Sequence, residues 1–333
     1  MSTPTQTPPP HVVVLQMLMG AWVAQMAATA ARFGVADAMA RGVTSADDLA
    51  REVGADAEGL YRLLRGCAAA GLFSETSPRQ FALTPLGDCL RSDAQNSLRD
   101  FLIAEAAPGH WLPWGQLYDA IRSGTSHAAE ILGVPVWEYY AKNHEEGTSF
   151  ARGMGNLSAI ASRDIAPLYD ASPFRRIVDV GGSQGVLLRA LLERAPDARG
   201  ILFDLPEVVA GAQPHDRIEI VAGSFLEEVP SGGDLYVLKS ILHDWPDDRC
   251  AVILANVHRA AAPGAKLLLV ETMLPPPPQP SPAAFMDLNM LVMLGGRERT
   301  ADEFGALLRE AGFRIERVIP TGGLFHLIEA SRD

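Results

Sequence analysis

Lysine and positive charge are scarce in this chain of 333 residues. Lys142, Lys239 and Lys266 are the only lysines, and 40 acidic residues outnumber 28 Lys and Arg, for a formal net charge of −12. Binding to a nucleic-acid backbone requires excess positive charge, so this balance argues against nucleic acid as the main partner. The 48% of hydrophobic and 20% of charged residues are otherwise typical of a globular protein with a substantial core.

Only three cysteines occur, and they lie far apart. Cys67, Cys89 and Cys250 form no Cys-x-x-Cys pair, so the sequence predicts neither a disulfide framework nor a cysteine-based zinc site. This use of cysteine fits a reducing compartment, and we expect a cytoplasmic protein in which each cysteine is a small buried hydrophobic residue. The histidines lack a metal-ligand spacing such as HExxH, and we predict no metal site.

The N-terminus lacks the basic segment and short apolar run of a secretory signal. Residues 1–10 are rich in Thr and Pro and predict a disordered tail. Residues 12–31 then run for twenty positions without a charge, long enough to span a bilayer. Because Gln16, Gln25 and Thr29 dilute the apolarity and no basic flank sets an orientation, we expect a helix buried at a homodimer interface and no membrane anchor.

The following segment predicts two short helices and a hairpin. Thr44 or Ser45 caps a helix that Gly54 ends, and Asp56 begins a second helix. Two short apolar pieces follow in residues 72–83. Helix, turn, helix and wing form the winged-helix arrangement, which often binds DNA. Acidic residues and arginines nearly balance here, so we interpret residues 11–100 as a winged-helix domain used for packing and dimerisation.

The second half of the chain predicts an α/β fold. Residues 101–170 predict a helical connector, whose aromatic residues could contribute to a substrate pocket. In residues 171–333, short apolar strands alternate with helices, which indicates a parallel sheet covered on both faces. Only residues 321–323 separate the last two strands, so these two must pair antiparallel.

A glycine-rich turn follows the first of these strands. Residues 178–185 read Val-Asp-Val-Gly-Gly-Ser-Gln-Gly, which lacks the G-x-G-x-x-G spacing of dinucleotide sites and suits a looser turn against a ligand. Asp204 ends the next strand, twenty-five residues after Asp179, where an acid can accept the hydroxyl groups of a ribose. The turn and the acid together indicate a nucleoside-like ligand at the carboxyl edge of the sheet.

A histidine is expected at the same edge. His243 follows the strand at residues 234–239 and precedes a helix, and Glu271 ends the next strand. Neighbouring strand ends should bring the Glu271 carboxylate close enough to orient the imidazole, as in a general base with its partner. Such an imidazole could accept a proton from a phenol, whose pKa is near 10.

In combination, these segments resemble the small-molecule O-methyltransferases that use S-adenosylmethionine. The resemblance covers nearly the whole chain, and its segments are residues 178–185, 203–206, 223–225, 238–245, 270–271 and 295–300. It implies a Rossmann-like class I methyltransferase sheet, parallel with an antiparallel last strand, in a catalytic domain at residues 171–333. The winged-helix half corresponds to the family's dimerisation domain.

The resemblance also implies roles for single residues. His243 resembles the catalytic base, and Glu271 and Glu298 resemble two acids that bracket it. The implied cofactor-binding residues are Asp179, Gly181, Asp204, Leu205, Ser224, Phe225 and Lys239. The implied substrate-binding residues are Asp244, Met286, Asn289, Met290 and Met293. An apolar helix face that packs in the core is an alternative explanation for the last four.

The chain departs from the family's pattern at three positions. Ser183 and Gln184 stand in a turn that usually reads Gly-Gly-Gly-Thr-Gly, and Ser224 replaces an Asp that accepts the adenine amino group. These departures leave three hypotheses open. The first is methyl transfer from S-adenosylmethionine to a hydroxyl of an aromatic or enolic molecule in secondary metabolism. The second is non-methylating chemistry on the same scaffold, such as hydroxylation or a pericyclic reaction. The third is a ligand-responsive, DNA-binding winged helix.

The retained acids and histidine favour the first hypothesis. In it, His243 removes the proton from the acceptor hydroxyl, the methyl group is transferred in line, and S-adenosylhomocysteine is the second product.

Overall fold

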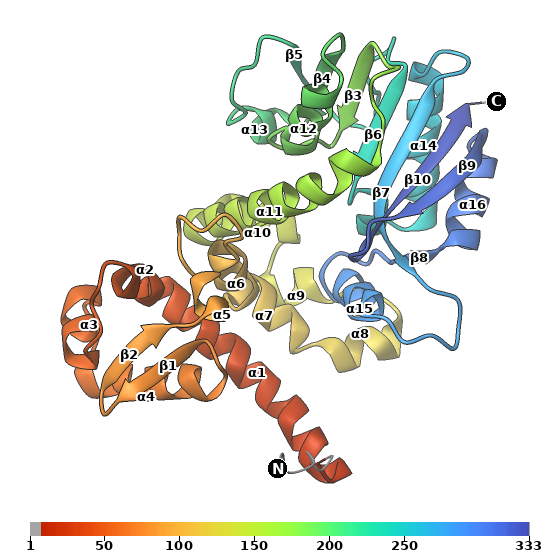
Figure 1. Cartoon of the computed structure of the whole chain (residues 1–333). Coiled ribbons are helices and arrows are strands. Elements are labelled where there is room, and N and C mark those ends of the chain that lie inside the picture. Colours follow the sequence, from red (N-terminus) through yellow and green to blue (C-terminus); the bar gives the residue numbers. More distant parts are fainter. Residues whose placement is uncertain (1–7, 333) are drawn as a thin grey trace, which may run out of the picture. The chain divides into compact units, whose positions relative to one another are not determined.

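The computed structural model describes residues 8–332, which form two compact units (Figure 1). Among the described residues, the first unit extends to Trp111 and also contains Tyr139–Leu157, and the second contains Leu112–Glu138 and the residues from Ser158 onward. Most of the predicted tail at residues 1–10 lies outside the described residues, and α1 begins at its last residue. The predicted divisions of the chain after residues 10, 100 and 170 stay predictions.

The first unit contains the predicted helix, turn, helix and wing. Its elements are α1 (Pro10–Phe33), α2 (Val35–Ala40), α3 (Ala46–Val53), α4 (Ala57–Ala69), β1 (Phe73–Ser77), β2 (Gln80–Leu83), α5 (Pro85–Asp88) and α6 (Arg99–Glu105). Both predicted helix caps are confirmed: Ser45 accepts a hydrogen bond from the Asp48 amide, and Asp56 accepts one from the Gly59 amide. β1 and β2 pair antiparallel as the wing.

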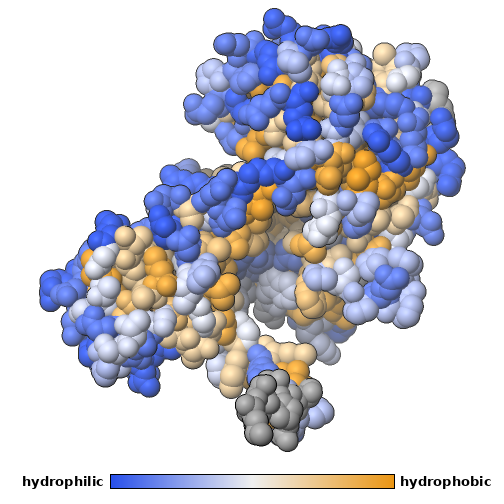
Figure 2. All heavy atoms as spheres, in the orientation of Figure 1, coloured by the Kyte–Doolittle hydropathy of each residue, from blue (hydrophilic) through white to orange (hydrophobic). Residues whose placement is uncertain are grey.

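α1 exposes most of its apolar surface. Its buried residues are Ala27, Ala28, Ala30 and Ala31. Large side chains before them are exposed, among them Leu15, Met17, Leu18 and Trp22. Apolar side chains, coloured orange and pale orange, are visible on this unit in Figure 2. Among residues 8–332, α1 is the one helix long and apolar enough to cross a membrane. A single chain therefore does not supply the burial that this helix was expected to have.

The prediction of helices in residues 101–170 is confirmed. They are α7 (Pro108–Trp114), α8 (Leu117–Ser123), α9 (Ala128–Leu132), α10 (Val136–Lys142) and α11 (His144–Ile165). α7, α10 and α11 contribute residues to both units.

The second unit is built on one large sheet. Its strands are β3 (Arg176–Val180), β4 (Arg199–Asp204), β5 (Ile218–Ala222), β6 (Leu235–Lys239), β7 (Lys266–Leu274), β8 (Arg299–Thr300), β9 (Phe313–Pro320) and β10 (Phe325–Arg332). The order is β5-β4-β3-β6-β7-β10-β9, and β8 pairs with β7. β3 to β7 are parallel, and β10 is antiparallel to both of its neighbours. The predicted α/β sheet with an antiparallel last strand is confirmed.

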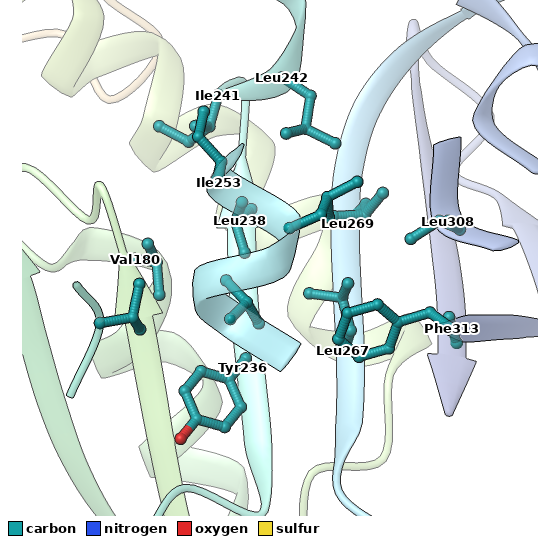
Figure 3. Packing of buried hydrophobic residues seen from close by; sticks show 14 of the residues in the cluster. Val180, Tyr236, Leu238, Ile241, Leu242, Ile253, Leu267, Leu269, Leu308 and Phe313 are labelled. Carbon is teal, nitrogen blue, oxygen red and sulfur yellow. The ribbon is translucent and has the colours of Figure 1, made fainter. Parts of the chain in front are cut away.

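Helices cover both faces of this sheet (Figure 1). The α-helices that follow α11 in the chain are α12 (Val186–Arg194), α13 (Pro206–Val209), α14 (Asp247–Ala260), α15 (Ala283–Met293) and α16 (Ala301–Glu310). α14 and α16 pack on one face, where Leu267 and Leu269 point, as Figure 3 shows. α12 and the end of α11 pack on the other, with Leu268 and Val270. Burial on both sides explains why these strands are continuously apolar.

The topology places a ligand edge where the sequence predicted one. From β3 the chain proceeds outward through β4 and β5, and then returns to the other side of β3 with β6 and β7. The strand order thus reverses beside β3, and in open α/β sheets ligands bind outside the carboxyl ends of the strands at such a switch point.

Candidate active site

The glycine turn after β3 packs closely against the end of β4 and against the buried side chain of Asp179. The Gly181 and Gly182 amides both donate to the Phe203 carbonyl, at 2.8 and 3.3 Å. A Cβ atom on Gly182 would lie 2.6 Å from the carboxyl group of Asp179, which is itself buried. Ser183 adopts the left-handed region with φ 52°, a conformation uncommon for a residue with a side chain.

Asp204 joins this turn to the end of β4. One carboxylate oxygen accepts a hydrogen bond from the Ser183 amide and the other accepts one from the Leu205 amide, both at 2.8 Å. Burial raises the pKa of Asp204, and these two hydrogen bonds oppose the rise. Each oxygen keeps a further lone pair, so the carboxylate can still accept hydroxyl groups of a ligand. The Leu205 side chain beside it is 41% exposed.

Ser224 and Phe225 follow β5 at the same edge. The Ser224 hydroxyl accepts a hydrogen bond from the Leu226 amide at 3.3 Å, so this serine starts a local turn. The ring of Phe225 packs edge to face against Trp245, with 6.1 Å between the ring centroids. The backbone carbonyl of Phe225 accepts a hydrogen bond from the Asn256 side chain at 2.9 Å. Contacts of both its side chain and its backbone therefore fix the position of Phe225.

Lys239 ends β6 among acidic groups. Burial lowers the pKa of its ammonium group, and the charges of Asp179, Glu271 and Asp244 oppose that effect. Burial likewise raises the pKa of Asp179 to about 7, against the opposing charge of Lys239.

His243 lies in the short 3-10 helix at Leu242–Asp244, just after β6. Its Nδ1 atom is 2.9 Å from a Glu298 carboxylate oxygen, and its Nε2 atom is 3.3 Å from an oxygen of Asp244. Burial by itself disfavours the imidazolium. The charge of Asp244, the hydrogen bond to Glu298 and the charges of Glu271 and Glu298 outweigh burial, and the pKa of His243 is raised to about 9.

The expectation that Glu271 orients the imidazole is wrong in its geometry. One Glu271 oxygen instead accepts hydrogen bonds from the Ile241 amide at 3.1 Å and the Leu242 amide at 2.9 Å. Glu271 thus fixes the backbone before the histidine, and Glu298 fixes the ring. Burial raises the pKa of Glu271 to about 7, with the positive charge of His243 opposing and the charge of Glu298 adding.

His243, Glu271 and Glu298 bring one ligand-type atom each within 4.8 Å of one another. Such a group could in principle hold a cation. A cation on Nδ1 would replace the hydrogen bond to Glu298 and withdraw electron density from the ring, which would weaken the imidazole as a base. The second carboxylate oxygens of Glu271 and Glu298 are buried, without a hydrogen-bond partner among the described residues.

The candidate substrate residues differ in exposure. Met290 and Met293 of α15 are buried, whereas Met286 and Asn289 are half-buried. The Asn289 oxygen accepts a hydrogen bond from the Trp114 indole at 2.7 Å. Sequence reasoning missed this contact because 175 positions separate the two residues. Burial raises the pKa of Asp244 to about 6, with the charge of His243 opposing and that of Glu298 adding.

Comparison with known proteins identifies this architecture. A family model described as an O-methyltransferase domain matches residues 114–314, and an O-methyltransferase dimerisation domain matches residues 15–93. The chain belongs to the O-methyltransferase family. The resemblance and the fold class inferred from the sequence are both confirmed.

Two relatives of this O-methyltransferase come from bacteria. A phenazine O-methyltransferase, PhzM, of Lysobacter antibioticus is 38% identical over 325 residues, which cover 96% of this chain and 95% of the relative. A mitomycin biosynthesis 6-O-methyltransferase of Streptomyces lavendulae is 34% identical over 328 residues, covering 96% and 94%.

A solved structure shares the fold over the whole chain. Human N-acetylserotonin methyltransferase, in complex with S-adenosylmethionine, matches this O-methyltransferase with a TM-score of 0.91 and 27% identity, covering 99% of both chains. The chain is thus an enzyme of the methyltransferase class.

Proposed function

We propose that this O-methyltransferase transfers a methyl group from S-adenosylmethionine to a hydroxyl of an aromatic or enolic small molecule in secondary metabolism. The observation that carries the proposal is His243, held between Glu298 and Asp244 at the sheet edge that also presents the glycine turn and Asp204. S-adenosylhomocysteine is the expected second product.

The residues at this edge fit the cofactor chemically. Asp204 retains lone pairs for ribose hydroxyls, Gly181 adds no side chain to the turn, and Leu205 offers exposed apolar surface beside them. Phe225 and Ser224 would flank the adenine of the cofactor. Lys239 would face the cofactor's carboxylate, and Asp179 would support the glycine turn. The bound cofactor supplies an electrophilic methyl group on a sulfonium.

His243 is the base in this proposal. The acceptor hydroxyl gives its proton to Nε2, while the Glu298 carboxylate on Nδ1 stabilises the imidazolium that forms. Asp244 faces Nε2 in this structure, so the acceptor hydroxyl must share or replace that contact. Glu271 keeps the preceding backbone in place. The remaining rate enhancement would come from holding the two reactants in line.

The proposed substrate class rests on the substrates of the relatives and on the side chains of the candidate substrate-binding residues. A phenazine and N-acetylserotonin are aromatic, and Asp244, Met286, Asn289, Met290 and Met293 combine one acid and one amide with flexible apolar side chains. Methionine adapts to flat aromatic shapes through its unbranched thioether. We propose that these residues line the acceptor site.

A homodimer through α1 completes the proposal. Residues 15–93 match a dimerisation domain, and α1 exposes large apolar side chains over the same stretch. A second copy of this chain would bury them, so α1 need not enter a membrane. A cytoplasmic location, expected from the cysteine use, remains part of the proposal.

The test is transfer of a labelled methyl group. Purified protein is incubated with methyl-labelled S-adenosylmethionine and a panel of hydroxyphenazines, N-acetylserotonin and simple phenols. His243→Ala should lower turnover by about 10²–10⁴ and leave S-adenosylhomocysteine affinity unchanged, while His215→Ala, in the loop before β5, serves as the matched control. Equal turnover in the His243 variant would refute its role. Conversion of an acceptor without uptake of label would favour the second hypothesis, non-methylating chemistry.

A further inference from the structure

One buried charge of the second unit has no part in the proposal above. Arg299, in β8, is 1% exposed, and it is among the largest fully buried side chains of the described residues. Taking a guanidinium out of water costs several kcal/mol unless its donors are satisfied. The hydrogen bonds that it makes therefore show what it holds.

The guanidinium of Arg299 binds both ends of the turn that carries His243. One terminal nitrogen donates to the Leu242 carbonyl, and the other donates to the Trp245 carbonyl, both at 2.9 Å. Asp247, at the start of α14, accepts two further hydrogen bonds, at 2.6 and 3.0 Å, and supplies the opposite charge. The two bound carbonyls belong to the residues directly before His243 and directly after Asp244.

The segment before β8 holds the same turn from its middle. The Arg297 amide donates to the His243 carbonyl at 2.9 Å. A Cβ atom on Gly296 would lie 2.0 Å from that carbonyl oxygen, so the close approach requires glycine. Glu298, between Arg297 and Arg299, binds the imidazole itself. Consecutive residues of one short segment thus fix the backbone and the ring of His243.

Side-chain packing alone does not define this turn. Ile241 and Leu242 extend into the apolar core beside Leu238 and Leu269 (Figure 3), which anchors the turn to the sheet. Apolar contacts are not directional, whereas the planar guanidinium binds two carbonyls in a fixed fork geometry. The Cys250 sulfur also lies 3.2 and 3.4 Å from the Leu242 and Trp245 carbonyl oxygens, but a thiol has one proton and is a weak donor.

We infer that Arg299 is a positioning residue of this enzyme: its guanidinium holds the Leu242 and Trp245 carbonyls and thereby keeps the His243 imidazole on Glu298. The inference rests on the proposed role of His243 as the base. Lysine could keep the positive charge beside Asp247, but its single ammonium lacks the fork that reaches both carbonyls.

The test compares Arg299→Lys with Arg249→Lys, a substitution of an exposed arginine on α14. Three quantities are measured on the full chain: kcat with the best acceptor of the panel, the dissociation constant of S-adenosylhomocysteine, and the imidazole signals of ¹⁵N-histidine-labelled protein. Thermal unfolding shows whether each variant is folded. We expect Arg299→Lys to lower kcat at least tenfold, to change S-adenosylhomocysteine affinity less than twofold, and to shift or broaden the His243 imidazole signal. Arg249→Lys should match the unsubstituted protein in all three.

A folded Arg299→Lys protein with unchanged kcat and an unchanged His243 signal would overturn the inference. If Arg299→Lys does not fold, Asp247→Asn replaces it: this change keeps the guanidinium and weakens its anchor, and an unmoved His243 signal there would equally overturn the inference. Failure of the proposed function is a separate result, because it would appear as full activity in His243→Ala.

Discussion

At the scale of single residues, the environment of His243 decides how the enzyme responds to pH. The acids around the imidazole outweigh its burial and raise its pKa to about 9. The imidazolium therefore predominates at neutral pH, and a protonated ring cannot accept the proton of a hydroxyl group. We expect kcat to rise with pH up to about 9, by roughly tenfold per unit below the pKa. Turnover that is independent of pH between 6 and 9 would contradict the role of His243 as the base.

Asp244 offers a direct test of that electrostatic account. Its carboxylate lies 3.3 Å from Nε2 and is the first of the charges that raise the pKa of His243. In Asp244→Asn this charge is lost, so the imidazole should lose its proton at lower pH, and the rising limb of kcat should move toward neutral pH. The measurement is the pH profile of kcat for both proteins. If the rising limb of kcat stays at the same pH in Asp244→Asn, then Asp244 does not raise the pKa of His243.

The two glutamates should differ in their importance. Glu298 contacts the ring, whereas Glu271 contacts two backbone amides that a glutamine oxygen could also bind. Removing the charge from Glu298 should lower kcat by about tenfold or more, since a neutral amide stabilises the imidazolium less than a carboxylate does. Glu271→Gln should lower kcat less. Equal kcat values for Glu298→Gln and Glu271→Gln would mean that the charge of Glu298 beside the ring does not set the rate.

At the scale of elements, the close fit of the segment before β8 against the His243 turn is testable through Gly296. A methyl group there would meet the His243 carbonyl, so Gly296→Ala should destabilise the fold by about 1–3 kcal/mol and lower activity. The matched control is Gly305→Ala in α16, where the nearest atom would lie at 3.8 Å. That change should stabilise the helix by roughly 0.5–1 kcal/mol. Chemical denaturation of both variants measures the difference.

Regular elements could be predicted from the sequence because periodicity and caps are local signals. Ser45 and Asp56 cap helices as predicted, and α16 begins with a capping box of Thr300 and Glu303, whose spacing is also a local signal. β8 was missed because two residues carry no periodicity. The cysteines were predicted to be buried, which is right for Cys67 and Cys250, but Cys89 is only half-buried.

Within the site, strand ends could be predicted from the residues, whereas the acid on the imidazole was indicated only by the family resemblance. The apolar strands predict where His243 and Asp204 lie, because the carboxyl ends of parallel strands meet at the same edge of the sheet. Which acid binds the imidazole depends on how the chain folds back after α15, since Glu298 lies 55 positions beyond His243 in the sequence. No pattern in the sequence distinguishes it from Glu271. The hydrogen bond between Trp114 and Asn289 likewise joins residues far apart in the sequence, so no local pattern predicts it.

At the scale of the whole molecule, the exposed face of α1 should determine the oligomeric state. Leu18 and Trp22 are each 58% exposed, and charges at these positions would oppose burial against a second copy. We expect Leu18→Glu with Trp22→Glu to convert a dimer into a monomer, measured as molar mass by light scattering. Val252→Glu, at an exposed apolar position on α14, is the control and should stay dimeric. A monomeric parent protein would contradict the proposed homodimer.

We propose that the carboxyl edge of this sheet binds S-adenosylmethionine even though Ser183, Gln184 and Ser224 depart from the family's pattern. Calorimetric titration of the purified protein with S-adenosylhomocysteine, with NAD as the control ligand, tests it most directly. We expect S-adenosylhomocysteine to bind in the micromolar range or tighter and NAD not to bind. The absence of S-adenosylhomocysteine binding by folded protein would contradict it.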